Sequence, residues 1–245
     1  MLGRNFAIDQ GNTSIKIAEF NNDQLVSVTT YKDIYDAREI FAQLAEHPTM
    51  ICSVSGNLNE IKGIIGGGDR NIRLLDYNTE VPLDNQYQSK KTLGMDRLAA
   101  VCGAKVIFPK SDCLVVDFGT CITYDYISAD SIYNGGAISP GMKMRFEAMN
   151  KFTNSLPYVR ASRGLVELVG VTTEKSLQSG VINGITAEVE GFIEKYSEIS
   201  EGMEVLFCGG DSVRFESITK APIFAAPNLV VVGLNSILRH NEDSI

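Results

Sequence analysis

The chain has 245 residues, a formal net charge of -8, and 44% hydrophobic and 21% charged residues. This length suits one large domain or two small ones, and the composition is that of an ordinary globular protein. The acidic balance argues against nucleic acid or an anionic membrane as the main partner, and no run is apolar enough to span a bilayer.

The cysteine and histidine pattern argues against a zinc site and against a disulfide framework. The Cys residues are scattered through mostly apolar runs, no Cys-x-x-Cys pair occurs, and the only His residues are His47 and His240. Reduced, buried thiols and the lack of a signal-peptide pattern predict a cytoplasmic protein.

The first predicted element is a strand, a tight turn and a second strand within residues 6–20. An apolar run ends at Asp9, a turn of two to three residues follows from Gly11, and Lys16 lies in the alternating second strand. Exposed amides, hydroxyl groups and one Lys suit a phosphate tail, and the acid beside them suits a metal ion that neutralises the tail. An ordinary solvent-facing hairpin would show the same pattern.

Helices and strands then alternate along the first part of the chain. We expect strands at residues 24–30 and 50–54, helices at 34–46 and 57–65, a polar loop at 81–92, and a helix from Gly94 to Ile107. Three antiparallel-looking strands followed by this alternation predict a mixed sheet with helices rather than a purely parallel one.

Residues 113–127 repeat the form of the first hairpin. Both stretches read as an apolar strand, Asp-x-Gly and a second alternating strand, and their acids, Asp9 and Asp117, are 108 positions apart. This spacing is about the size of a small domain, and a second copy is much more specific than either copy alone. The repeat predicts two similar halves, residues 1–112 and 113–245, with a site in the cleft between them.

The rest of the second half alternates in the same way. We expect a strand at residues 131–138, a Gly- and Pro-rich loop at 135–141, helices at 142–151 and 173–198, strands at 204–207 and 222–224, and a last helix at 228–239.

The motif set is similar to that of type III pantothenate kinase, within the superfamily of sugar kinases, actin and Hsp70 ATPases. The matching elements occur in the family's order over nearly the whole chain: Asp9-x-Gly11-Asn12-Thr13 with Lys16, Tyr87, Leu93-Gly94-x-Asp96-Arg97, Asp117-x-Gly119-Thr120, Gly135-Gly136-x-Ile138-x-Pro140-Gly141, Leu156-Pro157, Gly170-x-x-Thr173 and Gly209-Gly210. The Gly-x-Asp-Arg element is the most specific of them. The resemblance implies an α/β fold of two ribonuclease-H-like (actin-like ATPase) halves, with mixed sheets flanked by helices and a cleft between the halves.

The resemblance also implies an activity. It implies ATP-dependent phosphorylation of the primary hydroxyl of pantothenate to 4′-phosphopantothenate, the first step of coenzyme A biosynthesis. It further implies Mg2+ or another divalent cation with ATP, a monovalent cation such as K+ or NH4+, and a homodimer.

The candidate site residues follow from the same resemblance. It implies that ATP is bound by Asp9, Gln10, Gly11, Asn12, Thr13, Ser14, Ile15, Lys16 and Thr120. It implies that the substrate is bound by Tyr87, Gly94, Met95, Asp96, Arg97 and Thr173. Asp117 resembles the family's monovalent-cation ligand, and Thr173 resembles a substrate contact that acts across the dimer interface. Asp96 is the candidate general base, although an Asp in the first turn of a helix is also stabilised by the helix dipole without a catalytic role.

Three positions depart from the family's pattern and leave substrate affinity open. Lys90 stands where the family often has Pro, Thr172 where it often has Asn, and Cys121 where it often has Ala. Two alternatives stay open, a non-catalytic nucleotide-binding regulatory relative and another small-molecule kinase of the superfamily. The presence of Asp9, Asp96, Arg97 and Asp117 argues against a regulatory relative that has lost catalysis. The substrate-side residues, Tyr87 and Gly94 to Arg97, distinguish the chain from another small-molecule kinase.

Overall fold

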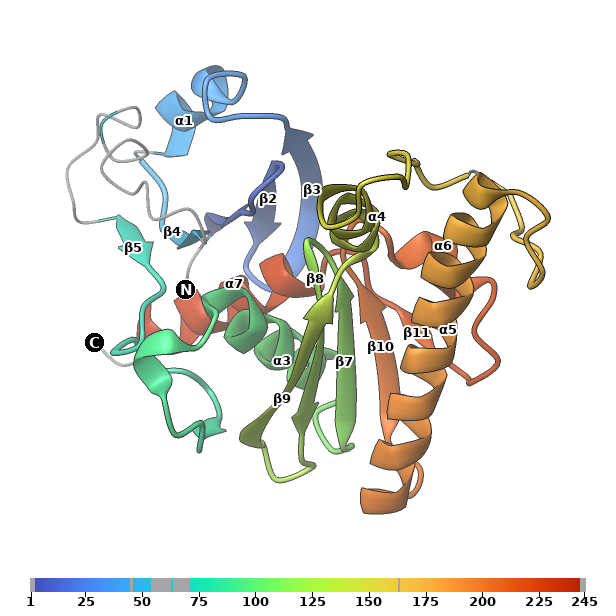
Figure 1. Cartoon of the computed structure of the whole chain (residues 1–245). Helices are drawn as coiled ribbons and strands as arrows, with labels where there is room; N and C mark the ends of the chain where they lie inside the picture. Colours follow the sequence, from blue (N-terminus) through green and yellow to red (C-terminus); the bar gives the residue numbers. More distant parts are fainter. Residues whose placement is uncertain (1–2, 45, 54–62, 64–70, 163, 243–245) are drawn as a thin grey trace. The chain divides into compact units, whose positions relative to one another are not determined.

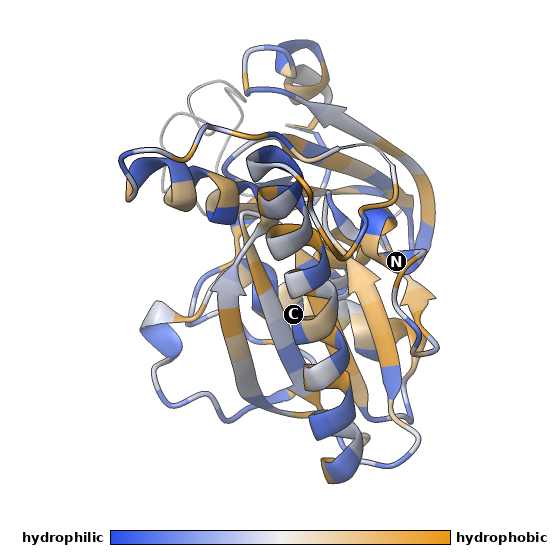
Figure 2. Cartoon of the chain, turned by 45° about the vertical axis from the view of Figure 1, so that its right-hand side comes forward, coloured by the Kyte–Doolittle hydropathy of each residue, from blue (hydrophilic) through white to orange (hydrophobic). Residues whose placement is uncertain are grey.

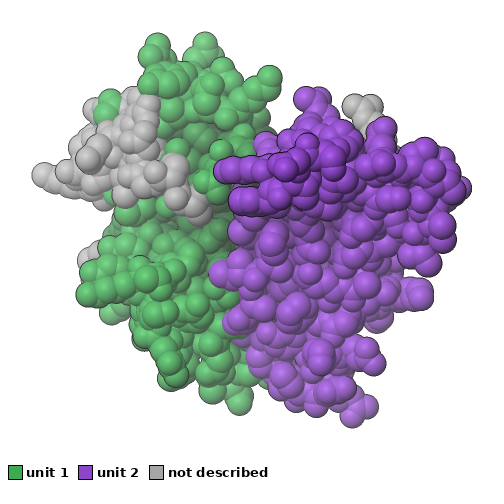
Figure 3. All heavy atoms as spheres, in the orientation of Figure 1, with its two compact units in different colours: residues 1–111, 127–135, 228–245 green, residues 112–126, 136–227 purple. Residues whose placement is uncertain are grey.

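The structure, a computed structural model, describes residues 3–44, 46–53, 63, 71–162 and 164–242 (Figure 1). The chain forms two compact units, which Figure 3 colours separately. Unit 1 comprises residues 1–111, 127–135 and 228–245, and unit 2 comprises residues 112–126 and 136–227. The units differ in extent from the predicted halves, because residues 127–135 and 228–245 belong to unit 1. The helix predicted at 57–65 lies outside the described residues, apart from Gly63.

Unit 1 contains a five-stranded sheet in the order β3-β2-β1-β4-β5. Its strands are β1 (Arg4–Gln10), β2 (Ile15–Asn21), β3 (Gln24–Tyr31), β4 (Thr49–Ser53) and β5 (Ile72–Leu74). The pairs β1–β2 and β2–β3 are antiparallel, whereas β4 pairs parallel with β1 and with β5. The predicted mixed sheet is therefore confirmed, although the short strand β5 was not predicted.

The helix α1 (Arg38–Leu44) is shorter than the helix predicted over residues 34–46. The carboxylate of Asp33 accepts hydrogen bonds from the backbone N–H groups of Tyr35 (2.8 Å) and Asp36 (3.0 Å). A short acidic side chain that captures these N–H groups competes with helical hydrogen bonds, so the chain turns before α1 begins.

Two helices, α3 (Met95–Ile107) and α7 (Leu229–Glu242), lie side by side in unit 1 (Figure 1). The predicted helices at both places are confirmed. The buried ammonium of Lys105, near the end of α3, donates hydrogen bonds to three backbone carbonyls, at 3.0–3.2 Å, from residues 111, 128 and 129. These bonds fix the C-terminal end of the helix that carries the Gly-x-Asp-Arg motif at its other end.

The second sheet has the order β11-β10-β7-β8-β9-β6. Its strands are β6 (Asp84–Asn85), β7 (Cys113–Phe118), β8 (Cys121–Ile127), β9 (Ile132–Pro140), β10 (Glu204–Cys208) and β11 (Phe224–Ala225). β6, the last residue of β8 and the first four of β9 belong to unit 1. The polar loop predicted at 81–92 contains β6 and a short 3-10 helix, η1 (Lys90–Thr92).

The longest helix, α5 (Thr173–Ile199), packs on unit 2's part of this sheet, and the shorter helices of the unit are α4 (Met142–Lys151) and α6 (Ser212–Glu216). The stripe predicted for α5 is confirmed, because its members are buried with residues of β7, β8 and β10: Leu177, Val181, Ile185, Val189 and Ile193. Figure 2 shows the outward side of α5 mostly in hydrophilic or neutral colours and several strands largely in orange. None of the described helices is long and apolar enough to cross a membrane.

Candidate active site

The hairpin between β1 and β2 forms one part of the candidate site. Four residues, Gly11 to Ser14, join the two strands, so the predicted length of two to three residues is wrong. The Gly11 N–H donates a hydrogen bond to the Ser14 carbonyl at 3.1 Å and closes the loop. Asn12 and Thr13 are exposed at the tip, where amides and a hydroxyl group can meet a phosphate.

Asp9 lies half-buried near the end of β1, opposite Lys16 on β2 and Cys52 on β4. Burial raises the pKa of Asp9 from 3.8 to about 6, the negative charge of Asp96 adds to this increase, and the positive charge of Lys16 opposes it. Burial also raises the pKa of the Cys52 thiol, and the charges of both carboxylates act in the same direction. Asp9 and Asp96 are therefore near enough for their charges to repel, a repulsion that a bound cation would relieve.

Asp96 lies in the first turn of α3, two residues after Gly94 at the N-cap position. Its Oδ1 accepts a hydrogen bond from the Arg97 N–H at 2.9 Å. A Cβ atom added at Gly94 would lie 2.4 Å from the same Oδ1, so a larger residue there would displace the carboxylate. The Gly of the Gly-x-Asp-Arg motif thus leaves the space that the Asp occupies.

Arg97 is the buried cation of the site, with only 6% of its surface exposed. Its guanidinium lies 5.6 Å from the centre of the Tyr87 ring, within the range of a cation–π contact. On β9 the buried ring of Tyr133 stacks against Tyr87, with centroids 6.2 Å apart and an interplanar angle of 9°. The stack holds Tyr87, and Tyr87 in turn limits the orientations of Arg97.

The second hairpin, in unit 2, has the predicted form. Asp117 is half-buried near the end of β7, and a two-residue turn of Gly119 and Thr120 leads into β8. The Gly119 N–H donates a hydrogen bond to the Cys121 carbonyl at 3.0 Å. Thr120 is exposed, as a phosphate contact needs to be.

Gly209, after β10, leaves room for the Asp117 carboxylate. Its φ is +89°, and an added Cβ would lie 2.4 Å from Asp117 Oδ1 and 2.6 Å from the Phe118 backbone. We expect Gly209→Ala to lower the free energy of unfolding by about 2 kcal/mol, because the strained φ and the clash act together. Thermal unfolding measures the change, and Gly210→Ala is the matched control, since a Cβ there meets nothing within 4 Å. Equal melting temperatures for the two variants would contradict this reading.

Thr173 lies exposed at the start of α5, on a different element of unit 2 from the second hairpin. Thr172, one of the departures from the family's pattern, is the N-cap of that helix and accepts a hydrogen bond from the Lys175 N–H at 3.2 Å. Asn and Thr are both effective N-caps, so this departure keeps the helix start intact.

Two candidate residues, Ile15 and Gln10, turn their side chains to other parts of unit 1, and a third, Met95, is half-buried. Ile15 is buried in the core at 3% exposure, and Gln10 accepts a hydrogen bond from Ser53 Oγ at 2.8 Å. Met95 is half-buried as the first residue of α3. A ligand at the hairpin would therefore meet the backbone rather than the side chain of Ile15.

The donor chemistry fits cations that are shared with phosphate oxygens. Among the described residues, no group of three or more His, Cys, Asp or Glu side chains could hold a metal ion. Asp9 and Asp117 each offer one carboxylate beside a turn rich in backbone amides. Mg2+ is commonly held by one or two carboxylates together with substrate phosphates and water, which suits Asp9.

The structure thus links five candidate residues in unit 1, through strand pairing, charge interactions, a hydrogen bond and a cation–π contact: Lys16, Asp9, Asp96, Arg97 and Tyr87. Sequence reasoning missed Tyr133 behind the Tyr87 ring and Cys52 beside Asp9. Both neighbours come from strands distant in the sequence, so no local pattern indicated them.

Comparison with known proteins identifies the family. A sequence profile described as type III pantothenate kinase matches residues 5–195. The type III pantothenate kinase of Phocaeicola vulgatus is 41% identical over 242 residues, 97% of this chain and 99% of that protein. That of Cytophaga hutchinsonii is 39% identical over 237 residues, with the same shares of both chains. The chain belongs to the type III pantothenate kinase family.

Solved structures at lower identity resemble this member of the family in fold alone. A Campylobacter jejuni protein described as a conserved putative Baf family transcriptional activator has a TM-score of 0.63 at 22% identity, over 97% of this chain and 99% of that one. A putative 2-dehydro-3-deoxygalactonokinase from Sinorhizobium meliloti has a TM-score of 0.55 at 17% identity, over 96% and 98%. Together with the mixed sheets, these likenesses confirm the predicted α/β fold with mixed sheets flanked by helices.

Proposed function

We propose that this member of the type III pantothenate kinase family transfers the γ-phosphoryl group of ATP to the primary hydroxyl of pantothenate. The products are 4′-phosphopantothenate and ADP, in the first step of coenzyme A biosynthesis, and we place the enzyme in the cytoplasm. Similarity to pantothenate kinases over 97% of the chain supports the reaction. The observation in the structure that carries the proposal is the linked set in unit 1, from Lys16 through Asp9 and Asp96 to Arg97.

The first hairpin serves the phosphate end of ATP in this proposal. The Lys16 ammonium and the amides of Gly11 to Ser14 would bind the polyphosphate, because phosphoryl transfer depends on neutralised charge and fixed reactants. Asp9 would hold Mg2+ together with the phosphates, and the cation would offset both the burial of the Asp9 carboxylate and the repulsion from Asp96 that raise its pKa. The metal, when bound, neutralises charge on the phosphate oxygens.

Asp96 is the proposed general base. In a loose transition state the hydroxyl proton leaves late, so the carboxylate mainly orients the attacking oxygen and then accepts its proton. The space left by Gly94 and the hydrogen bond from the Arg97 N–H hold the carboxylate in one place. Such fixed geometry is what an in-line transfer requires.

Arg97 would bind the single carboxylate of pantothenate, because a guanidinium meets a carboxylate in a forked geometry. We expect Arg97→Met to raise the KM for pantothenate by about 100-fold with a smaller change in kcat, since Met keeps the bulk but loses a charge-assisted contact. Steady-state kinetics on pantothenate and on its uncharged alcohol analogue provide the test. An equal loss with both substrates would contradict the carboxylate assignment, because the analogue offers Arg97 no charge.

In unit 2, we assign Asp117 to the monovalent cation, K+ or NH4+, and Thr120 to a phosphate contact. The support is the repeat of the Asp-x-Gly hairpin and the position of Thr120 at its exposed tip. The carboxylate of Asp117 is a hard oxygen donor, which suits such a cation.

A homodimer is also part of the proposal, with Thr173 as a substrate contact near the dimer interface. Large apolar side chains are exposed within one short segment before Thr173: Leu165 (91%), Leu168 (78%), Val169 (72%) and Val171 (75%). Exposed apolar groups of this density indicate a protein contact, and we assign a second copy to it.

Analytical ultracentrifugation tests the dimer. We expect the wild type to sediment as a dimer and Leu168→Asp/Val169→Asp as a monomer, because two charges would be buried in an apolar interface. Val213→Asp is the matched control, since Val213 is 71% exposed but lies outside this segment. A monomeric wild type, or a dimeric double variant, would contradict the assignment.

The direct test of function is ADP release over a panel of hydroxyl acceptors, with Mg2+ and with K+ or Na+. We expect turnover with pantothenate and stimulation by K+. Turnover of a sugar but not of pantothenate would instead indicate another small-molecule kinase, and nucleotide binding without turnover would indicate a regulatory relative.

A further inference from the structure

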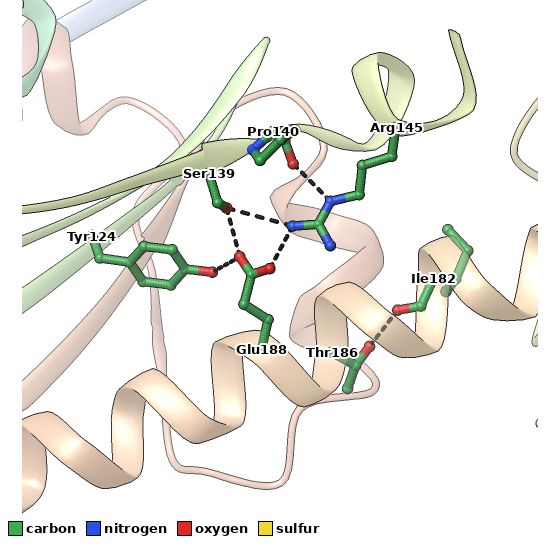
Figure 4. A network of polar contacts seen from close by, with 7 residues as sticks. All are labelled: Tyr124, Ser139, Pro140, Arg145, Ile182, Thr186 and Glu188. Carbon is green, nitrogen blue, oxygen red and sulfur yellow. Dashed lines mark hydrogen bonds and ion pairs between the residues drawn. The ribbon is translucent and has the colours of Figure 1, made fainter. Parts of the chain in front are cut away.

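A network of polar side chains lies in unit 2 beside the second hairpin (Figure 4). Its centre is the carboxylate of Glu188 on α5, which accepts hydrogen bonds from Tyr124 Oη (2.9 Å) and Ser139 Oγ (2.5 Å) through Oε1. A guanidinium nitrogen of Arg145 on α4 donates to Glu188 Oε2 at 2.6 Å. The three donors come from β8, β9 and α4, so Glu188 joins four elements of unit 2.

Glu188 is the anionic member of this network. Burial alone would raise its pKa, but hydrogen bonds from Ser139, Arg145 and Tyr124 and the charge of Arg145 together lower the pKa below its usual value. The side chains of Glu188 and Arg145 are only 25% and 20% exposed. Arg145 therefore donates a charge-assisted hydrogen bond to Glu188 in a place that is partly shielded from water.

Arg145 also contacts the last residue of β9 through its Nε atom. Arg145 Nε donates a hydrogen bond to the Pro140 carbonyl at 2.8 Å (Figure 4). The next residue, Gly141, donates its N–H to the Thr120 carbonyl at 3.1 Å. A Cβ added at Gly141 would lie 2.4 Å from the carbonyl oxygens of Gly119 and Thr120, so the backbone at Gly141 lies directly against the hairpin.

We propose that Glu188 and Arg145 are positioning residues for the nucleotide, because they fix Pro140 and Gly141 against the Gly119–Thr120 turn. The inference rests on the proposed phosphate contact of Thr120. The rigid support keeps the turn in the conformation that receives phosphate, so less conformational freedom is lost when the nucleotide binds. Neither residue needs to touch the nucleotide.

Positioning and simple electrostatics predict opposite results. Glu188→Gln removes a negative charge from the surroundings of the proposed phosphate site, so charge alone would tighten nucleotide binding. Positioning predicts weaker binding, because Gln loses the negative charge that Arg145 pairs with, and its single amide oxygen cannot replace both carboxylate oxygens that accept hydrogen bonds here. Arg145→Lys keeps the charge but lacks the planar fork that joins Glu188 and the Pro140 carbonyl.

The test is equilibrium titration of the full-length protein with ADP, together with steady-state kinetics. We expect both Glu188→Gln and Arg145→Lys to raise the Kd for ADP and the KM for ATP by about tenfold, and to change the KM for pantothenate by less than about twofold. Val189→Ala on α5 is the control, since Val189 is fully buried in the core of unit 2 and loses packing only. It should lower the melting temperature without changing the Kd for ADP.

The outcomes separate this inference from the function on which it rests. Unchanged ADP affinity in both network variants, or tighter binding by Glu188→Gln, would overturn the positioning role, as would an equal effect of Val189→Ala. Thr120→Val tests the underlying assignment. If Thr120→Val leaves ADP affinity unchanged, the phosphate contact of Thr120 is wrong, whatever the network variants do.

Discussion

Asp96→Asn is expected to lower kcat about 1,000-fold, within the range that general-base catalysis supplies. Asn has nearly the same shape, and its side-chain oxygen can still accept the hydrogen bond from the Arg97 N–H that Asp96 accepts at 2.9 Å. It cannot accept the hydroxyl proton. The geometry of the helix start is therefore kept while the proposed chemistry is removed.

Nucleotide binding separates catalysis from damage to the fold in this variant. Titration with ADP should give a Kd within about twofold of the wild type, because Asp96 is not assigned to the nucleotide. Glu39→Gln is the control, since Glu39 is also an acid in the first turn of a helix, α1. If Asp96→Asn keeps more than about a tenth of the wild-type kcat, Asp96 is not the base.

Asp9→Asn is expected to stabilise the protein above pH 6 and to impair the reaction. In the unfolded chain Asp9 ionises near pH 3.8, whereas in the folded protein its pKa is about 6. The folded state thus binds the Asp9 proton more tightly than the unfolded chain does. The protonated carboxyl therefore contributes to the free energy of unfolding below pH 3.8, and this contribution is lost as the pH rises through 6. The ionised Asp9 therefore costs roughly 3 kcal/mol above pH 6, a cost that Asn does not carry.

Thermal unfolding without nucleotide or metal measures this effect. At pH 8 the melting temperature of Asp9→Asn should exceed that of the wild type by about 5 °C or more, and the difference should shrink as the pH falls from 6 towards 4. Asp130→Asn, at an exposed turn, is the control and should change little at any pH. A gain that is the same at pH 8 and pH 4 would show that the buried charge is not its cause.

The same variant should lose about 100-fold in kcat/KM for ATP, since the metal would lose its carboxylate ligand. Asp9→Asn would then raise the melting temperature of the protein while it lowers kcat/KM for ATP. A strained or repelled acid that destabilises the free protein is a common feature of active sites.

Much of the fold was predictable because its signals are local. The Asp-x-Gly turns, the stripe of α5 and the stop of α3 before Pro109 each lie within one element, where period and turn chemistry decide the structure. The candidate site was predictable for a different reason. The order of the motifs resembled a known family, whereas single residues such as Asp96 had equally good structural explanations.

The unpredicted features depend on contacts between distant parts of the chain. Tyr133 stacks on Tyr87 across 46 positions, and Glu188 receives its hydrogen bonds from residues 43 to 64 positions away. The strands β5 and β6 have three residues or fewer, so pairing with β4 and β9 defines them rather than any periodicity. The early start predicted for α1 was wrong because the Asp33 side chain captured the N–H groups that a helix would use.

A single-turnover experiment follows the γ-phosphoryl group from ATP to its acceptor. Enzyme in excess is mixed with ATP labelled in the γ-phosphate, pantothenate, Mg2+ and K+, then quenched with acid, and the labelled products are separated and identified. We expect the label to move to the primary hydroxyl of pantothenate in the wild type and to stay in ATP with Asp96→Asn. Label released as inorganic phosphate, or pantothenate recovered unlabelled from an enzyme that labels another acceptor, would contradict this expectation.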